Sequence, residues 1–139
     1  MKSNMMRKFL IAAPALLLGG LLAASLPAQA QSSATALKNL DTDHDGTLDL
    51  AEAKTAASAL FDKLDKDKDG TLDKAEVQKR ISSGAFAMAD PDKDGTLSKD
   101  EYLALVEQRF QAADTDKDGT LSADELKTPA GRSLLRLLQ

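Results

Sequence analysis

The fold of this chain is set by a twelve-residue stretch, Asp65–Glu76, which reads DKDKDGTLDKAE. The pattern returns as DTDHDGTLDLAE at Asp41–Glu52, DPDKDGTLSKDE at Asp90–Glu101 and DTDKDGTLSADE at Asp114–Glu125. Every copy has aspartate at positions 1, 3 and 5, glycine at position 6 and glutamate at position 12. These four windows hold 20 of the 22 acidic residues of the chain. Such a concentration of carboxylates at fixed spacing predicts metal-binding loops.

The residue types in each window suit a hard cation that takes oxygen ligands. Glycine at position 6 allows the sharp turn, position 7 offers a backbone carbonyl, and glutamate at position 12 is long enough to close the shell with both oxygens. The predicted metal ligands are therefore positions 1, 3, 5, 7, 9 and 12 of each loop. They are Asp41, Asp43, Asp45, Thr47, Asp49, Glu52, Asp65, Asp67, Asp69, Thr71, Asp73, Glu76, Asp90, Asp92, Asp94, Thr96, Ser98, Glu101, Asp114, Asp116, Asp118, Thr120, Ser122 and Glu125.

The first 30 residues have a different character. Three basic residues precede an apolar run at Phe9–Leu26, and Ala28-Gln29-Ala30 follows. This order predicts a cleaved secretory signal, a periplasmic location and a mature chain starting at Gln31. The apolar run is shorter than the ~20 residues of a spanning helix, so no membrane anchor is expected after cleavage.

Charge and cysteine content narrow the classes of protein. Loss of the three positive charges of residues 1–30 takes the net charge from −4 to −7, which opposes binding to nucleic acid or to anionic membranes. The chain has no cysteine, so disulfides cannot stabilise it after export. Residues 31–139 are expected to form one metal-binding domain with a thin core. Because the carboxylates of an empty loop repel one another, we expect a loose metal-free state that folds on binding.

The spacing of the loops predicts how they are joined. They start at residues 41, 65, 90 and 114, so only 12 or 13 residues separate one loop from the next. Neighbouring loops must therefore share a helix. Apolar residues recur at three- and four-residue intervals over 50–64 and over 99–113, which predicts two amphipathic helices.

The helix lengths also predict which loops pair. A fifteen-residue helix spans about 22 Å, so the loops at its two ends cannot be partners. The middle connector is interrupted at Ser82-Ser83-Gly84, where a serine can cap a second short helix and let the chain fold back. The second and third loops should then pair, and the first and fourth by elimination. The position 8 leucines should lie in the core, and the C-terminal residues after Thr128-Pro129 should cover it.

Together with the spacing, two flanking segments resemble a known family. They are Glu101-Tyr102-Leu103-Ala104 and the closing run from Glu125 to Gly131. With the four loops and the signal segment, they resemble the lanmodulins, the periplasmic lanthanide-binding EF-hand proteins of methylotrophic bacteria. The resemblance implies an all-α fold, a compact helical bundle with four EF-hand loops sharing short connecting helices. It also implies selective binding of lanthanide(III) ions of the La, Ce and Nd type. The protein is expected to be a monomer. Implied partners are a periplasmic lanthanide-dependent dehydrogenase or an uptake system.

Two positions depart from that family or differ among the loops. Lanmodulin loops have proline at position 2, whereas in this chain only the third loop has one, Pro91. At position 9 the first two loops have Asp49 and Asp73, giving five carboxylates at the predicted ligand positions, and the last two have Ser98 and Ser122, giving four. We expect the first two loops to be the tighter lanthanide sites. Ca²⁺ is the alternative or weaker ligand.

Three other classes of function fit the sequence less well than a metal carrier. A calcium sensor that exposes a groove for a partner usually relies on methionine side chains. Met88 is the only methionine after the signal segment. A cohesin-docking module needs only two such repeats. No enzyme is expected, because the carboxylate clusters are accounted for as ligands and no nucleophile has a histidine beside it. The single histidine, His44, occupies position 4 and should face solvent.

Overall fold

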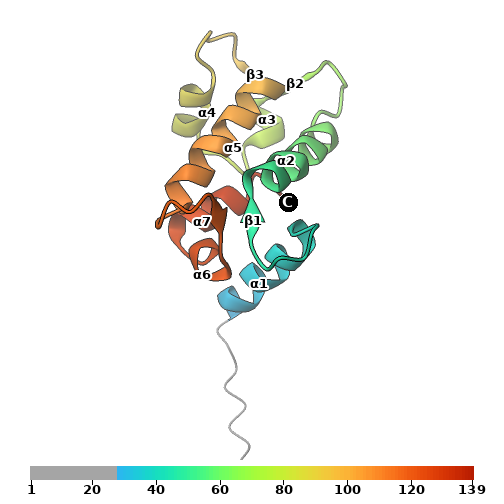
Figure 1. Ribbon diagram of the computed structural model, residues 1–139. Coiled ribbons are helices and arrows are strands. Elements are labelled where there is room, and N and C mark those ends of the chain that lie inside the picture. Colours follow the sequence, from blue (N-terminus) through green and yellow to red (C-terminus); the bar gives the residue numbers. More distant parts are fainter. Residues whose placement is uncertain (1–27) are drawn as a thin grey trace, which may run out of the picture.

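The computed structural model describes residues 28–139, the first four of them by their backbone alone. The predicted apolar signal run at Phe9–Leu26 lies outside the described residues. Within the described part, seven helices surround two small β-bridges, which confirms the predicted helical fold (Figure 1). The elements are α1 Ala28–Leu40, β1 Leu48–Asp49, α2 Leu50–Leu64, β2 Thr71–Asp73, α3 Lys74–Val77, α4 Ser83–Ala89, β3 Thr96–Ser98, α5 Lys99–Ala113, β4 Thr120–Leu121, α6 Ala123–Leu126 and α7 Pro129–Leu135.

Helices α2 and α5 are the shared helices that the spacing predicts, with the same bounds. Each begins directly after position 9 of one loop and ends directly before position 1 of the next. The N–H groups of Asp65 and Asp114 donate to the carbonyls of Phe61 and Phe110, both at 2.9 Å. The first ligand of the following loop is thus the C-cap of the helix, and no residue is left for a linker.

The two shared helices lie side by side in the centre of the molecule (Figure 1) and run antiparallel. Lys54 in the first half of α2 pairs with Glu107 in the middle of α5 at 2.8 Å, and Lys99 at the start of α5 pairs with Asp62 near the end of α2 at 2.9 Å. Asp62 and Glu107 are the two acidic residues that lie outside the loop windows. Because these pairs are partly exposed, each contributes at most about 1 kcal/mol, and they chiefly set the orientation of the helices.

This antiparallel arrangement brings the predicted pairs of loops together. Strand β2 pairs with β3, and β1 pairs with β4, in both cases antiparallel. Leu72 lies opposite Leu97, and Leu48 opposite Leu121, and all four side chains are fully buried. The pairing predicted from helix length is confirmed, as is the core position of the position 8 leucines.

The middle connector and the C-terminus also follow the prediction. Ser82 caps α4, since its hydroxyl accepts from the N–H of Ala85 at 3.3 Å. Thr128 caps α7, which begins with Pro129. The C-terminal leucines are buried in the core between α5 and α6: Leu134, Leu135, Leu137 and Leu138.

Helices α1 and α6 were not expected from the sequence. Helix α1 buries Ala36, Leu37 and Leu40 against α2 and α6, and it begins before the predicted start of the mature chain at Gln31. Helix α6 has only four residues, too few for a periodic pattern. None of the helices in residues 28–139 is long and apolar enough to cross a membrane.

The buried leucine bridge gives a stability prediction. Leu121→Ala should lower the free energy of unfolding of the metal-loaded protein by about 2–5 kcal/mol, because it leaves a cavity opposite Leu48. Met88→Ala should stay within about 0.5 kcal/mol, since that side chain is 75% exposed. Urea unfolding followed by circular dichroism measures both. Equal effects of the two substitutions would contradict this account of the core.

Candidate metal-binding loops

Each loop is shaped by a hydrogen bond between positions 1 and 6. In loop 1 the Gly46 N–H donates to Asp41 Oδ2 at 3.0 Å, and the corresponding bonds in the other three loops are 3.0–3.1 Å long. The glycines have φ between 85° and 88°, a region that residues with a Cβ rarely adopt. Glycine at position 6 is therefore required by the backbone, as predicted.

Position 7 has a role that sequence analysis missed. In loop 3 the N–H and the hydroxyl of Thr96 both donate to Asp94 Oδ1 at 2.8 Å. The other loops repeat both bonds. The hydroxyl of Thr96, helped by its N–H, lowers the pKa of Asp94 and so favours its charged form. Threonine occupies position 7 in all four loops, although a backbone ligand there requires no particular side chain. This recurrence could have indicated that the threonine side chain has a role.

Position 12 joins each loop to the helix that follows it. In loop 1, Glu52 Oε1 accepts from the N–H and hydroxyl of Thr42 at 2.6 and 2.9 Å, and Oε2 accepts from the Asp49 N–H at 3.2 Å. Asp49 Oδ1 in turn accepts from the Glu52 N–H at 2.7 Å. This reciprocal capping box occurs at all four loops.

Position 9 is therefore the N-cap of a helix in every loop. Aspartate and serine are both good N-caps, which explains why the loops can alternate between them. The two residues act differently on the glutamate, however. The Ser98 and Ser122 hydroxyls also donate to Glu101 Oε2 and Glu125 Oε2, at 2.9 and 3.0 Å, whereas an ionised aspartate has no proton to donate.

The predicted carboxylate ligands converge within each loop. Oxygens from positions 1, 3 and 5 lie within 4.8 Å of one another in loops 1, 3 and 4, and in loop 2 the group is Asp65, Asp67 and Glu76. Asp90 Oδ1 and Asp114 Oδ1 are buried without a hydrogen-bond partner among the described residues. A buried carboxylate oxygen without a partner is costly unless a cation completes it. This donor set fits a hard metal ion, and the ligand roles of positions 7 and 9 stay predictions.

Loop 3 differs from the others at position 2. In loops 1, 2 and 4 the backbone N–H of this residue donates to the glutamate Oε1, at 2.6, 3.1 and 3.0 Å. Pro91 has no N–H, so Glu101 receives its hydrogen bonds only from Ser98 in the described part of the chain. Glu101 Oε1 is thus left with more of its lone pairs for a cation.

The carboxylate at position 3 has a raised pKa in every loop. For Asp116, the backbone N–H of Asp118 lowers the pKa, but burial and the charges of Asp118, Glu125 and Asp114 outweigh it and raise the pKa above its ordinary value. The position 3 residues of the other loops, Asp43, Asp67 and Asp92, have raised pKa values too. A cation bound among these oxygens offsets the repulsion between carboxylates that contributes to the raised pKa values.

The remaining polar residues of the loops face away from the ligand cluster. His44 is exposed, as predicted, and its φ of 63° is matched by the lysines at position 4 of the other loops. Asp100 is exposed, and Asp124 pairs with Lys127 at 2.6 Å. These residues contribute to the charge around the loops without entering the oxygen clusters.

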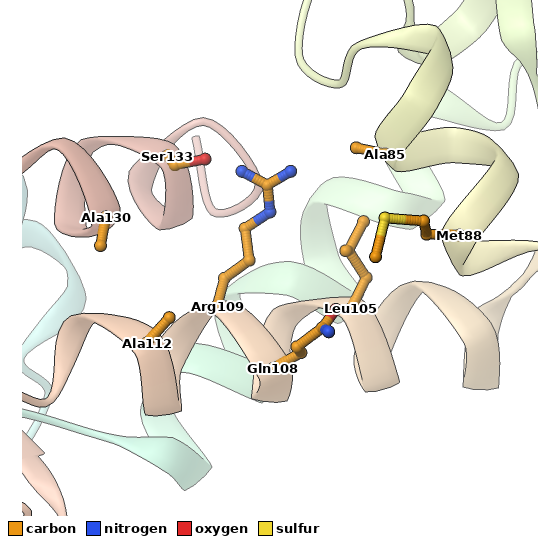
Figure 2. Close-up of a pocket in the computed structure, with 8 residues that line it drawn as sticks. All are labelled: Ala85, Met88, Leu105, Gln108, Arg109, Ala112, Ala130 and Ser133. Atoms are coloured by element: carbon orange, nitrogen blue, oxygen red, sulfur yellow. The ribbon is translucent and has the colours of Figure 1, made fainter.

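A groove of about 280 Å³ lies between α4, α5 and α7 (Figure 2). Arg109 extends across it, and Met88 and Leu105 form an apolar side. No predicted ligand residue lines the groove. Burial, helped by the nearby charge of Arg136, lowers the pKa of Arg109. Arg109 is the only charged side chain lining the groove, which contains no pair of groups suited to acid–base catalysis.

The raised pKa at position 3 gives a prediction with two opposite signs. Above that pKa the charge of Asp116 destabilises the metal-free folded loop, and the penalty disappears as the pH falls and the group takes up a proton. Asp116→Asn should therefore stabilise the metal-free form at pH 7 while weakening metal binding at loop 4 at least about tenfold. Urea unfolding with chelator and a calcium titration measure the two effects. A stabilised loop that binds metal as tightly as before would show that Asp116 is not a ligand.

Comparison with known proteins agrees with this geometry. The family model of the EF hand matches residues 34–54, 58–82, 83–106 and 105–128. Each match contains one complete loop. A comparison with curated proteins finds no match. EF-hand proteins are typically metal-binding and regulatory proteins without enzymatic activity. With four matched repeats and four clusters of ligand oxygens, the chain belongs to the EF-hand family and is a metal-binding protein.

Proposed function

We propose that this protein is a periplasmic carrier or buffer that binds lanthanide(III) ions in preference to calcium and folds on binding. The observation that carries the proposal is the density of converging carboxylates, with buried oxygens of Asp90 and Asp114 that have no partner among the described residues. Repulsion among the carboxylates, which adds to burial in raising the pKa at position 3, supports folding on binding, because it opposes closure of an empty loop.

Charge favours a trivalent ion in the loops that are richest in carboxylates. Coulomb attraction scales with the product of the charges, so each added carboxylate gains half as much again from a 3+ ion as from a 2+ ion at equal distance. Asp49 and Asp73 add a fifth carboxylate to loops 1 and 2. Each uses Oδ1 to cap its helix. The charge of the group still acts on the loop, which makes these loops the stronger lanthanide sites.

The closed core favours a carrier over a sensor. A sensor exposes a broad apolar groove, whereas Met88 is the one large hydrophobic side chain that is exposed within residues 32–139. The leucines after Pro129 fill the space between the helices. A monomer that delivers its ion to a lanthanide-dependent dehydrogenase or an uptake system fits this closed surface.

A calcium buffer is the second candidate, and position 2 favours it. The hydroxyls of Thr42 and Thr115 donate to Glu52 and Glu125 at 2.9 and 3.2 Å, adding to the backbone bonds. Each donor reduces the negative charge that the glutamate offers to the ion. This effect costs a trivalent ion more than a divalent one.

Buffered titrations separate the two candidates. Far-UV circular dichroism in chelator-buffered La³⁺ and Ca²⁺ should show helix forming at a much lower free concentration of La³⁺. Tyr102, which follows the loop 3 ligand Glu101, should sensitise Tb³⁺ emission that survives millimolar Ca²⁺. Equal midpoints for the two ions, or emission abolished by calcium, would favour the calcium buffer.

The contribution of position 9 is tested by exchanging residues between the paired loops 2 and 3. Asp73→Ser should weaken La³⁺ binding at loop 2 several-fold, on the order of 1 kcal/mol, because a carboxylate is lost and a hydroxyl donor to Glu76 is gained. Ser98→Asp should strengthen loop 3 by a similar factor. Isothermal titration calorimetry with La³⁺ and Ca²⁺ measures both variants. Changes of the same size for the two ions would remove position 9 as a source of selectivity.

A further inference from the structure

Gly131 in α7 packs directly against the backbone of α6. A Cβ at this position would lie 2.2 Å from the carbonyl oxygen of Glu125 and 2.5 Å from Leu126 Cα. Both are backbone atoms, so no side-chain rotation can relieve the contact. The absence of a side chain at residue 131 therefore sets how closely α7 approaches the last ligand of loop 4.

Hydrogen bonds hold the same contact. The Glu125 carbonyl accepts from the Thr128 hydroxyl at 2.7 Å and from the Thr128 N–H at 3.1 Å. The Thr128 oxygen accepts from the Gly131 N–H at 3.0 Å. Thr128 is thus bonded on one side to the backbone of a predicted metal ligand and on the other to the first turn of α7.

The side chain of Glu125 closes loop 4 from its other end. Its Oε1 accepts from the Thr115 N–H at 3.0 Å, and its Oε2 accepts from the Ser122 N–H at 3.0 Å. The residue is only 9% exposed. Because α6 ends one residue after Glu125, no long helix fixes the position of this ligand. Its backbone is instead held by Thr128 and Gly131.

The far end of the C-terminal segment, residues 128–139, reaches the other pair of loops. The Tyr102 hydroxyl donates to the Leu137 carbonyl at 2.9 Å, and burial raises the pKa of Tyr102 to about 12. Arg80 donates to the Arg136 carbonyl at 3.0 Å and also to that of Gln139. Tyr102 follows the loop 3 glutamate, and Arg80 lies four residues after the loop 2 glutamate, Glu76.

We propose that residues 128–139 form a positioning element that sets the metal affinity of loop 4 from outside the loop. Gly131 and Thr128 hold the Glu125 backbone where its carboxylate can reach the ion, and the bonds to Tyr102 and Arg80 tie that position to the second pair of loops. The proposal rests on the proposed metal-binding function, but it holds for La³⁺ and Ca²⁺ alike. It assigns Gly131 and Thr128 as positioning residues.

The experiment compares Gly131→Ala with Gly84→Ala in the full chain. Gly84 has no heavy atom within 4 Å of an added Cβ and provides the matched control. Each loop has one glycine at position 6, so the amide signals of Gly46, Gly70, Gly95 and Gly119 report the four loops separately in a heteronuclear NMR titration. Buffered La³⁺ and Ca²⁺ are the probes.

Gly131→Ala should move the Gly119 midpoint to at least about tenfold higher free metal, and by more than it moves the Gly70 midpoint. Gly84→Ala should leave the four midpoints unchanged. An unchanged Gly119 midpoint, or an equal shift of all four loops, would overturn the proposal. The ratio of La³⁺ to Ca²⁺ midpoints in the unmodified chain tests the proposed function separately.

A second pair of variants decides the matter where Gly131→Ala does not fold. Thr128→Val removes the hydroxyl bonds without adding bulk beside Gly131, and should shift the Gly119 midpoint in the same direction by a smaller factor. Thr128→Ser keeps the hydroxyl and should restore the midpoint. Equal midpoints for the valine and serine variants would show that the bond from Thr128 to Glu125 does not position the ligand.

Discussion

In loops 1, 2 and 4 the glutamate at position 12 connects the backbone at the start of the loop to the backbone of the helix that follows. One carboxylate oxygen faces the start of the loop, and the other accepts from the N–H of the helix N-cap, as Glu52 does with Thr42 and Asp49. The loop therefore cannot open without releasing the first turn of its helix. In this chain that coupling is strong because α2 and α5 also end on the first aspartate of the next loop. Helix capping and loop closure therefore depend on the same carboxylates that are predicted to bind the metal.

The antiparallel packing of α2 against α5 distributes the loops in a way that their ligand sets alone do not suggest. The number of carboxylates at the predicted ligand positions groups loop 1 with loop 2, and loop 3 with loop 4. The β-bridges instead join loop 1 to loop 4 and loop 2 to loop 3. Each structural pair therefore combines a loop with aspartate at position 9 and a loop with serine there. The two loops with aspartate at position 9 lie at opposite ends of α2, which keeps Asp49 and Asp73 apart.

Much of this architecture could be predicted, because the capping residues, the spacing of the loops and the lengths of the helices all indicate the same arrangement. The bounds of α2 and α5 follow from loops that leave no room for a linker, and the pairing follows from the length of a fifteen-residue helix. The caps of α4 and α7, at Ser82 and Thr128, were recognisable as residue types. Helices α1 and α6 were missed, since the apolar residues of α1 are mostly alanine and α6 is a single turn that persists by packing on α7.

The positions of the predicted ligand oxygens, the residues that start most of the helices and the loops that can meet are all encoded locally in the sequence. These properties depend on residue type and on separations of a few residues along the chain. What surrounds the predicted ligands depends instead on how the helices pack. Packing placed Gly131 on the backbone of Glu125 and joined Tyr102 to Leu137. Such contacts arise because α7 packs on the shared helix α5 and on α6, and no local pattern encodes which backbone atoms then come together.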